Sequence, residues 1–462
     1  MGRQLGWVWF GGLKSFIFYN TQPFFEILDP ESDSMLIEFP SNHLSYPPNV
    51  NIVNGNLNSP DVYIDTFSID AFLPTSQRLF LFDNKIYHIP LGLNSSTVFI
   101  GDSTADTTRA IIPKGALGIH DINNSYTRTV MNYVDFSQSD SFFANVMTDN
   151  GVIYCIPYID RRFQPPGTKD HIRLFAIIDL KTNTITFKDL GINQLLGNIE
   201  GVGTLNGPNY VFAILLGNKI YCFPLDQSGF RDQDIPAYKK YGFLVIDITN
   251  ESIINTTLGI ELDDSFIYPN GILYNNKIYS LIINLAQFNA YTYTASISIF
   301  SIDLQSNTTI SPPLISFDNP QDAMGAFYSG IPAQGGLILC SEGSRLYIIK
   351  HHKVDFMETD LSLSATINKV YAQDTIYSIN LENNEVNTIT LSRNVLGVVD
   401  AVALNGKIYL SCTGRGMFDF VEAPSLSEHR GLFVVNTANG NVKRVTERSM
   451  GRSIMVTGDI KI

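Results

Sequence analysis

Six related stretches decide the fold of this 462-residue chain, and the clearest of them is Gly217-Asn-Lys-Ile-Tyr-Cys-Phe-Pro224. Each has a two-residue turn signal followed by β-branched and aromatic residues, which is typical of a hairpin turn entering a β-strand. Their tyrosines are Tyr87, Tyr154, Tyr221, Tyr279, Tyr347 and Tyr409. The intervals between these tyrosines are 67, 67, 58, 68 and 62 residues. A repeat of about 64 residues therefore runs through the chain.

A second stretch follows each of the first ones, and it ends an apolar strand at Asp or Asn. These stretches run from Val98 to Asp102, Phe175 to Asp179, Phe243 to Asp247, Ile299 to Asp303, Ile376 to Asn380 and Leu432 to Asn436. An Asp or Asn side chain at the end of a strand caps an Asx turn, and the following Asn, Thr or Gly closes the hairpin. We therefore interpret these acidic residues as structural rather than catalytic.

Each repeat unit holds four strands, and a degenerate first copy at residues 14–19 and 25–33 brings the number of units to seven. Radial repetition of four-stranded sheets makes a β-propeller. The prediction is one all-β domain over residues 1–462, a seven-bladed propeller whose ring is closed by its N- and C-terminal strands. We expect blades at 1–45, 75–115, 140–190, 205–258, 266–312, 333–392 and 398–446. Residues 447–462 are expected to add a closing strand to the first blade.

The repeat resembles the Tyr-Val-Thr-Asn type of surface-layer propeller and, more loosely, kelch and galactose-oxidase-like propellers. The shared pattern is an Asn/Gly turn with an Ile-Tyr strand, followed by a hairpin such as Ile-Ile-Asp179-Leu-Lys-Thr-Asn-Thr184. The kelch Gly-Gly doublets are missing from most units. No residues match the copper-binding or quinone-binding positions of enzymatic propellers, so the resemblance implies a fold and leaves the function open.

Charge and cysteine content narrow the classes of partner. The chain has 31 Lys and Arg against 44 Asp and Glu, a net charge of −13, with no run of basic residues. Direct nucleic-acid binding is therefore not expected. Cys155, Cys222, Cys340 and Cys412 lack the Cys-x₂-Cys spacing of zinc and redox motifs, which predicts small buried hydrophobic residues and no disulfide between Cys155 and Cys222. No apolar run is long enough for a membrane span and no signal peptide is recognisable, so a cytoplasmic or virion-associated protein is expected.

Catalytic motifs are absent from the sequence. The seven histidines form no metal motif, and no nucleophile elbow or phosphate-binding loop occurs. We expect no enzyme activity, no cofactor and no metal. One alternative stays open, because acidic residues precede the predicted inner strands and could ring a channel mouth that attracts a cation; they are Asp140, Glu200, Asp264, Asp322 and Asp400.

Long inserts between the second and third strands of a blade mark the candidate binding surface. They span residues 159–174, 226–242, 348–374 and 413–430, and they hold 12 of the 31 Lys and Arg. In a four-stranded blade these loops emerge on the same face as the connections between blades, where binding residues concentrate. Arginine and aromatic residues are favoured interface anchors. The candidate partner-binding residues are Arg161, Arg162, Phe163, Arg231, Tyr238, Lys239, Arg415 and Phe418.

Three functions remain open at this point. The first is a non-enzymatic scaffold or protein-interaction module, for example a structural component of a virion or a cell-surface complex, with protein partners. The second is a carbohydrate-binding, lectin-like propeller. The third is a metal-dependent hydrolase at the central channel.

Overall fold

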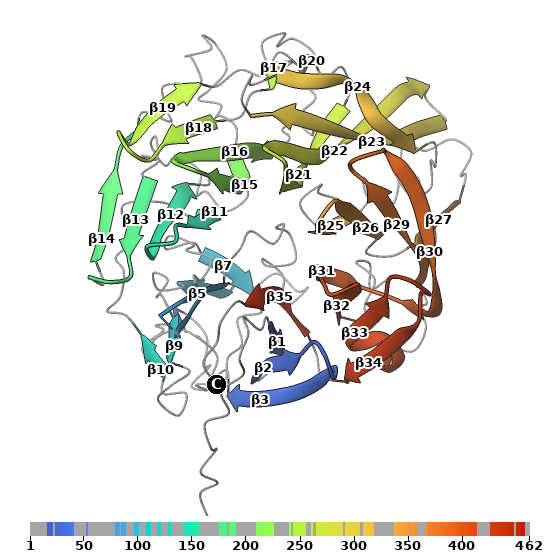
Figure 1. Ribbon diagram of the computed structural model, residues 1–462, viewed down its shortest axis with the longest axis horizontal. Coiled ribbons are helices and arrows are strands. Elements are labelled where there is room, and N and C mark those ends of the chain that lie inside the picture. The colour runs from blue at the N-terminus through green and yellow to red at the C-terminus, as the bar shows by residue number, and fades with distance from the viewer. Residues whose placement is uncertain are drawn as a thin grey trace, which may run out of the picture.

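The computed structural model describes 24 segments of the chain. They cover residues 16–21, 24–40, 52–53, 79–83, 85–88, 97–100, 108–111, 118–121, 128–130, 142–157, 175–182, 184–190, 209–225, 240–241, 244–255, 260–261, 265–289, 292–304, 308–317, 337–350, 353–357, 366–413, 426–447 and 450–457. Within these segments the fold is almost entirely β-structure, and four-stranded antiparallel sheets follow one another around a common centre (Figure 1). This radial arrangement of four-stranded sheets is the β-propeller architecture.

The described residues contain seven four-stranded sheets, named here from the inner to the outer strand. Sheet A consists of β35 (Met450–Thr457), β1 (Phe16–Thr21), β2 (Phe24–Asp29) and β3 (Ser34–Pro40). Sheet B consists of β5 (Leu79–Phe82), β6 (Lys85–His88), β9 (Gly118–Asp121) and β10 (Arg128–Val130). Sheet C consists of β11 (Phe142–Met147), β12 (Val152–Pro157), β13 (Phe175–Asp179) and β14 (Thr184–Lys188).

The other four sheets repeat this strand order. Sheet D consists of β15 (Asn209–Leu216), β16 (Lys219–Leu225), β18 (Leu244–Asp247) and β19 (Ser252–Asn255). Sheet E consists of β21 (Ser265–Tyr274), β22 (Lys277–Asn289), β23 (Thr292–Asp303) and β24 (Thr308–Phe317). Sheet F consists of β25 (Leu337–Glu342), β26 (Arg345–Lys350), β29 (Gln373–Asn380) and β30 (Glu385–Val395). Sheet G consists of β31 (Val398–Leu404), β32 (Lys407–Thr413), β33 (Arg430–Asn436) and β34 (Val442–Thr446).

The six repeat tyrosines lie on the second strand of their sheets, as predicted, and all are buried. They pack between neighbouring sheets: Tyr154 joins a core of sheets C and D, and Tyr347 joins a core of sheets F and G. The four cysteines are also buried in these layers and carry free thiols, with Cys155 in one core and Cys222 in the next. Burial raises the pKa of each thiol. The prediction of small buried hydrophobic cysteines is confirmed.

Turns between first and second strands explain the Asn and Gly of the repeat. Asn405 and Gly406 have φ angles of 54° and 70°, and Asn275 and Asn276 have 48° and 57°. Two consecutive positive φ angles are typical of the type I′ hairpin, whose twist matches the flanking strands. Asparagine and glycine enter this left-handed region at the lowest cost.

Turns between third and fourth strands are Asx turns, as predicted. The carboxylate of Asp179 accepts hydrogen bonds from the backbone N–H groups of Lys181 (2.8 Å) and Thr182 (3.2 Å). These two bonds lower the pKa of Asp179. The same side-chain-to-backbone bond, at 2.8 to 3.1 Å, forms at Asp29, Asp247, Asn380 and Asn436.

The prediction that Val98–Asp102 forms the third strand of its unit is wrong. The third strand of sheet B is β9, where Asp121 faces Lys85 just as Asp247 faces Lys219 in sheet D. Residues Thr97–Ile100 instead form β7, which pairs with β8 (Thr108–Ile111) in a separate sheet. Strand β7 (Thr-Val-Phe-Ile) is the more apolar and β-prone of the two candidates, whereas β9 (Gly-Ile-His-Asp) has one large apolar residue, so the local pattern favoured β7 although β9 pairs with β6. Sheet B consequently extends to Val130, beyond residue 115.

The last strand lies where the sequence predicted it. Strand β35 pairs antiparallel with β1, with Phe16 opposite Thr457 and Tyr19 opposite Ile454. It also contacts β31 and β32 of sheet G and β5 of sheet B. The segment near the end of the sequence therefore completes the sheet formed by the segment near its beginning.

Candidate functional site

The two faces of the propeller differ in what they carry. The turn face, as we name it, carries the hairpin turns between first and second strands and between third and fourth strands. The insert face is the opposite one and carries the connections between second and third strands and between sheets. It holds β4 (Ile52–Val53), β7, β8, β17 (Lys240–Tyr241), β20 (Ile260–Glu261), β27 (Lys353–Met357), β28 (Thr366–Tyr371) and α3 (Leu426–His429).

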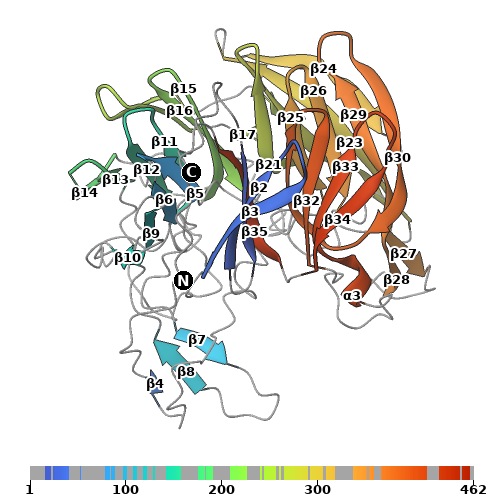
Figure 2. The ribbon, with the colours of Figure 1, turned by 60° about the horizontal axis from the view of Figure 1, so that its bottom comes forward.

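Additional β-structure on the insert face joins the two kinds of connection. Strand β4, from the connection between sheets A and B, pairs with β8, which lies between the second and third strands of sheet B. In the same way β17 pairs with β20, with Lys240 opposite Glu261. Both connections therefore emerge on one face in these two places, as predicted. Figure 2 shows β4, β7 and β8, and on the other side of the molecule β27, β28 and α3, below the four-stranded sheets.

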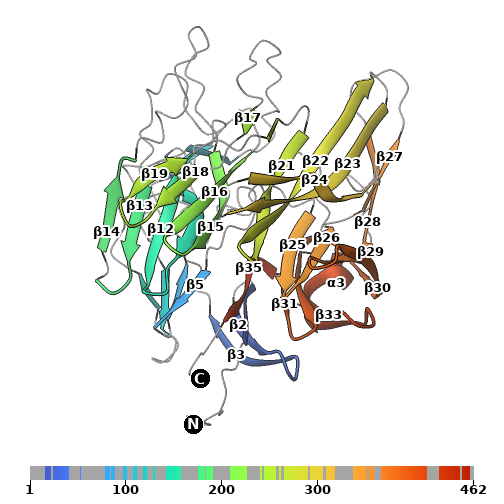
Figure 3. The ribbon, with the colours of Figure 1, turned by 45° about the horizontal axis from the view of Figure 1, so that its top comes forward.

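All eight predicted partner-binding residues lie outside the described residues; they are Arg161, Arg162, Phe163, Arg231, Tyr238, Lys239, Arg415 and Phe418. The insert boundaries need correction where the structure describes them. Residues 348–350 belong to β26 and 373–374 to β29. Between them, the described residues 353–357 and 366–371 form the hairpin β27–β28, beside β29 and β30 (Figure 3). Thr413 ends β32 and Arg430 begins β33. Ile348, Ile349 and Thr413 are β-branched residues, which favour continuing the strands that precede them.

Of the five acidic residues expected at a channel mouth, Asp400 is described. It lies in β31, where its carboxylate accepts a hydrogen bond from the N–H of Ala401. Asp140, Glu200, Asp264 and Asp322 lie outside the described residues. Within the described part of the chain, no three His, Cys, Asp or Glu side chains gather in a way that could hold a metal ion. No helix there is long and apolar enough to cross a membrane.

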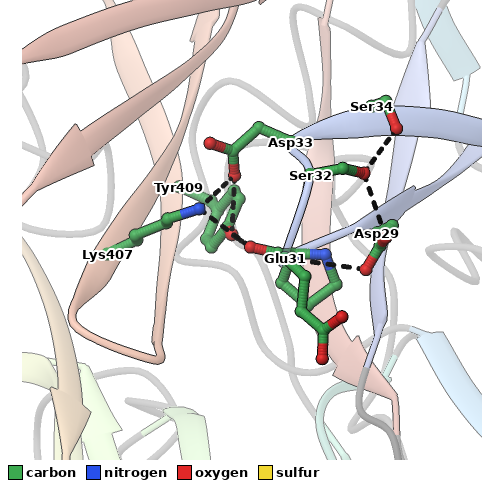
Figure 4. Close-up of polar contacts among 8 residues, drawn as sticks. Asp29, Glu31, Ser32, Asp33, Ser34, Lys407 and Tyr409 are labelled. Atoms are coloured by element: carbon green, nitrogen blue, oxygen red, sulfur yellow. Dashed lines mark hydrogen bonds and ion pairs between the residues drawn. The ribbon is translucent and has the colours of Figure 1, made fainter.

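The turn face has a polar contact that the sequence reasoning missed, between sheets G and A (Figure 4). Lys407, at the start of β32, donates hydrogen bonds to the carboxylate of Asp33 (2.8 Å) and to the carbonyl of Pro30 (2.9 Å). The hydroxyl of the fully buried Tyr409 donates to the same two oxygens at 3.3 Å. The pKa of Tyr409 is raised, mainly because the side chain is buried and also because the negative charge of Asp33 lies close to its hydroxyl. We call the contact between sheets G and A the seam, because sheet A joins β1, near the beginning of the sequence, to β35, near its end. Asp33, Lys407 and Tyr409 are the seam cluster.

Sheets F and G meet differently at the equivalent place. Gly440 occupies the turn position that Asp33 has in sheet A, with a φ of 69°. Its carbonyl accepts a hydrogen bond from the N–H of Ser392 (2.9 Å), and a Cβ at this glycine would lie 1.9 Å from the carbonyl oxygen of Thr390. The backbones therefore approach too closely to admit a side chain there.

A cavity of about 490 Å³ remains between sheets F and G on the turn face. Its lining includes Arg345 and Tyr347, which hold the same sequence positions in their repeat as Lys407 and Tyr409. Arg345 is the only charged residue among the described residues that line it. The others are mostly hydroxyl and amide side chains, including Ser378, Asn387 and Thr437. We call this cavity the F–G crevice.

Comparison with known proteins gives no family for this chain. No protein-family model matches it, and no curated protein matches it. Among solved structures, the β-propeller domain of the Trilobed protease from Pyrococcus furiosus is 11% identical, with a TM-score of 0.36 over 80% of this chain and 84% of that one. The Pan2 WD40 domain of Neurospora crassa is 9% identical, with a TM-score of 0.39 over 84% of this chain and 82% of that one.

Proposed function

We propose that this chain is a non-enzymatic protein-interaction scaffold that binds its partner through the insert face. The observation that carries the proposal is the extra β-structure on that face, where β4, β7 and β8, β17 and β20, and β27 and β28 form sheets additional to the seven. Rigid scaffolds present binding residues on loops supported in this way. The candidate residues Arg161, Arg162 and Phe163 belong to the insert that follows β12.

The proposal includes a seven-bladed ring closed by β35 and β1. Its support is the succession of contacts between neighbouring sheets: β11 with β15, β16 with β21, β21 with β25, β25 with β31, β31 with β35 and β35 with β5. The apolar core that includes Phe80, Tyr87 and Ile153 joins sheets B and C. In a closed ring every blade packs its apolar faces against both neighbours, and only short, protected sheet edges remain. We also propose that the repeat is of the Tyr-Val-Thr-Asn type, on the strength of the hairpin Ile178-Asp-Leu-Lys-Thr-Asn183 and the related Ile302-Asp-Leu-Gln-Ser-Asn307.

Affinity capture from the native source tests the scaffold function. The bait is the full chain, compared with the triple variant in which Arg161, Arg162 and Phe163 are changed to Ala. Lys219→Ala on the turn face is the matched control. We expect the triple variant to lose a protein partner that the control variant retains. A partner set that is the same for all three baits would remove this insert from the binding surface.

A further inference from the structure

The F–G crevice has an arginine that pairs with no acid among the residues that the structure describes. Arg345 is exposed, and its guanidinium makes no hydrogen bond or ion pair with any residue that the structure describes. Glu342 lies nearby in β25, but its carboxylate accepts the N–H of Gly406 (2.9 Å) and does not line the crevice. At the seam, Asp33 pairs with the equivalent lysine at 2.8 Å. Gly440 cannot carry such a carboxylate, because the carbonyl of Thr390 occupies the space of its side chain.

The lining of the crevice defines the chemistry of a ligand. A single guanidinium matches one carboxylate, which it can bind through two parallel hydrogen bonds. Around it, Ser378 and Thr437 carry hydroxyls, and Asn387 and Asn439 carry amides. Within the chain, the Thr437 hydroxyl donates to the carbonyl of Gly406, the Asn387 amide donates to Glu385, and the Asn439 oxygen accepts the N–H of Asn441. The Ser378 hydroxyl, the Thr437 and Asn387 oxygens and the Asn439 amide N–H groups still supply both donors and acceptors. Such groups suit the hydroxyls of a ligand. A volume of about 490 Å³ falls in the range of small-molecule sites.

We propose that the F–G crevice binds a hydroxylated monocarboxylate of about the size of an acidic monosaccharide. Arg345 pairs with the ligand carboxylate, and the hydroxyl and amide side chains hydrogen-bond its hydroxyl groups. The ligand is either a free sugar acid or the terminal acidic residue of a glycan, since both present the same chemistry. This site lies on the face opposite to the proposed partner surface, so it stands independently of the scaffold function.

Calorimetric titration of the full chain tests this site with four probes. D-glucuronate carries the carboxylate and the hydroxyls, D-glucuronamide replaces the charge by an amide, and cyclohexanecarboxylate keeps one carboxylate but lacks the hydroxyls. Methyl β-D-glucuronide has a blocked anomeric carbon and represents a glycan end. We expect glucuronate to bind at least about tenfold more tightly than glucuronamide, because a hydrogen bond to a charged group is stronger than a neutral one. It should also bind more tightly than cyclohexanecarboxylate, which has no hydroxyl groups to bond with the hydroxyl and amide side chains. Equal or tighter binding of the methyl glycoside identifies the glycan source, and binding of free glucuronate alone identifies the free acid.

Three variants separate the site from general effects. Arg345→Ala should bind glucuronate at least about tenfold more weakly while its melting temperature stays that of the wild type, because the side chain is exposed and pairs with no residue that the structure describes. Asn439→Asp keeps the oxygen that accepts the N–H of Asn441 but adds a negative charge to the lining, so it should also weaken binding. Lys219→Ala, at the same repeat position in sheet D, is the matched control and should bind normally. Equal affinities of wild type and Arg345→Ala, or no binding of glucuronate by the wild type at millimolar concentration, would overturn the proposal.

Discussion

The seam between sheets G and A and the F–G crevice are built on the same repeat positions but are closed in different ways. At the seam, Asp33 reaches across to Lys407 and Tyr409, and side chains join the two sheets. In the crevice, Gly440 brings the backbones of β30 and the next turn into direct contact, which leaves Arg345 and Tyr347 facing a cavity. The residue at one turn position thus determines whether side chains bridge the two sheets or leave a crevice between them.

This difference shows how a repeat fold can vary its surface without altering its blades. The residue at this turn position has a left-handed backbone in both places, with φ angles of 50° at Asp33 and 69° at Gly440. Gly440 allows the two backbones to pack closely but has no side chain to bridge the sheets. Asp33 has a small conformational cost from its positive φ, but its carboxylate forms an ion pair with Lys407. Other sheets use side chains as at the seam: Glu251 pairs with Lys188, and Tyr274 donates to Glu382 at 2.9 Å.

The largest expected effect comes from a side chain at Gly440. Gly440→Ala places a methyl group against the carbonyl of Thr390 and keeps a positive φ, so we expect unfolding to become easier by about 3 kcal/mol. Chemical denaturation measures this change. Gly217→Ala is the matched control, since Gly217 also has a positive φ but no atom lies within 4 Å of the position its Cβ would take, and it should cost only about 1 kcal/mol. Equal costs would mean that close packing at Gly440 is unimportant.

The second effect concerns the ion pair of the seam cluster. Lys407→Met leaves the carboxylate of Asp33 and the carbonyl of Pro30 without their charged donor, and we expect a loss of about 2 kcal/mol. A double-mutant cycle with Asp33→Asn should give a coupling of about 1 kcal/mol or more. Arg444 and Glu447 form a far more exposed pair, for which the same cycle should give no more than about 0.5 kcal/mol. A seam coupling as small as that would remove the distinction between the two interfaces.

A third, smaller effect comes from the Tyr409 hydroxyl. Tyr409→Phe removes its hydrogen bonds to Asp33 and Pro30 and should cost about 1 kcal/mol at neutral pH. Because the folded pKa of Tyr409 is raised, its contribution is fully present below the unfolded value near pH 10 and is lost as the pH rises through the folded pKa. The wild type should therefore lose stability above about pH 10 more steeply than Tyr409→Phe, which denaturation at neutral and alkaline pH measures. Equal losses of stability in the two proteins would contradict this interpretation.

The smallest effect is expected in an Asx turn away from both interfaces. Asp179→Asn keeps the accepting oxygen and makes the turn like that of Asn380, so the free energy of unfolding at pH 7 should change by no more than about 0.5 kcal/mol. The lowered pKa of Asp179 means that its charge stabilises the fold above the usual value near 4 and that this contribution is lost as the pH falls through the folded pKa. The variant should consequently lose less stability than the wild type on acidification, which denaturation at pH 7 and pH 3 measures.

Much of the fold could be predicted from the repeat because its strands are defined by local patterns. Buried tyrosines on second strands and Asx turns after third strands depend on a few adjacent residues, such as Asn436 and the N–H of Ala438. The pairing of β9 rather than β7 with β6 could not be predicted, since β7 is the more apolar strand and the choice depends on contacts distant in sequence. Local patterns do not encode such pairings.

The sequence contains a signal for the F–G crevice and the seam cluster that is separate from the strand pattern. A Lys or Arg stands two residues before the repeat tyrosine in five of the six clear copies: Lys85, Lys219, Lys277, Arg345 and Lys407. Whether that cation is paired depends on the turn residue of the neighbouring sheet, Asp33 in one place and Gly440 in another. Aligning the turns together with the strands would have singled out Arg345. The eight residues predicted on the insert face remain predictions, because they lie outside the described residues.

Removal and return of the last strand tests most directly whether a ring closed by β35 and β1 holds this propeller together. The truncated chain ends at residue 449, and a synthetic peptide of residues 450–462 is added in trans while thermal unfolding is followed. We predict that truncation lowers the melting temperature by about 10 °C or more, because sheet A loses its inner strand and its contacts with β31, and that the peptide restores it. A truncated chain that melts at the wild-type temperature, with no effect of the peptide, would contradict closure by β35.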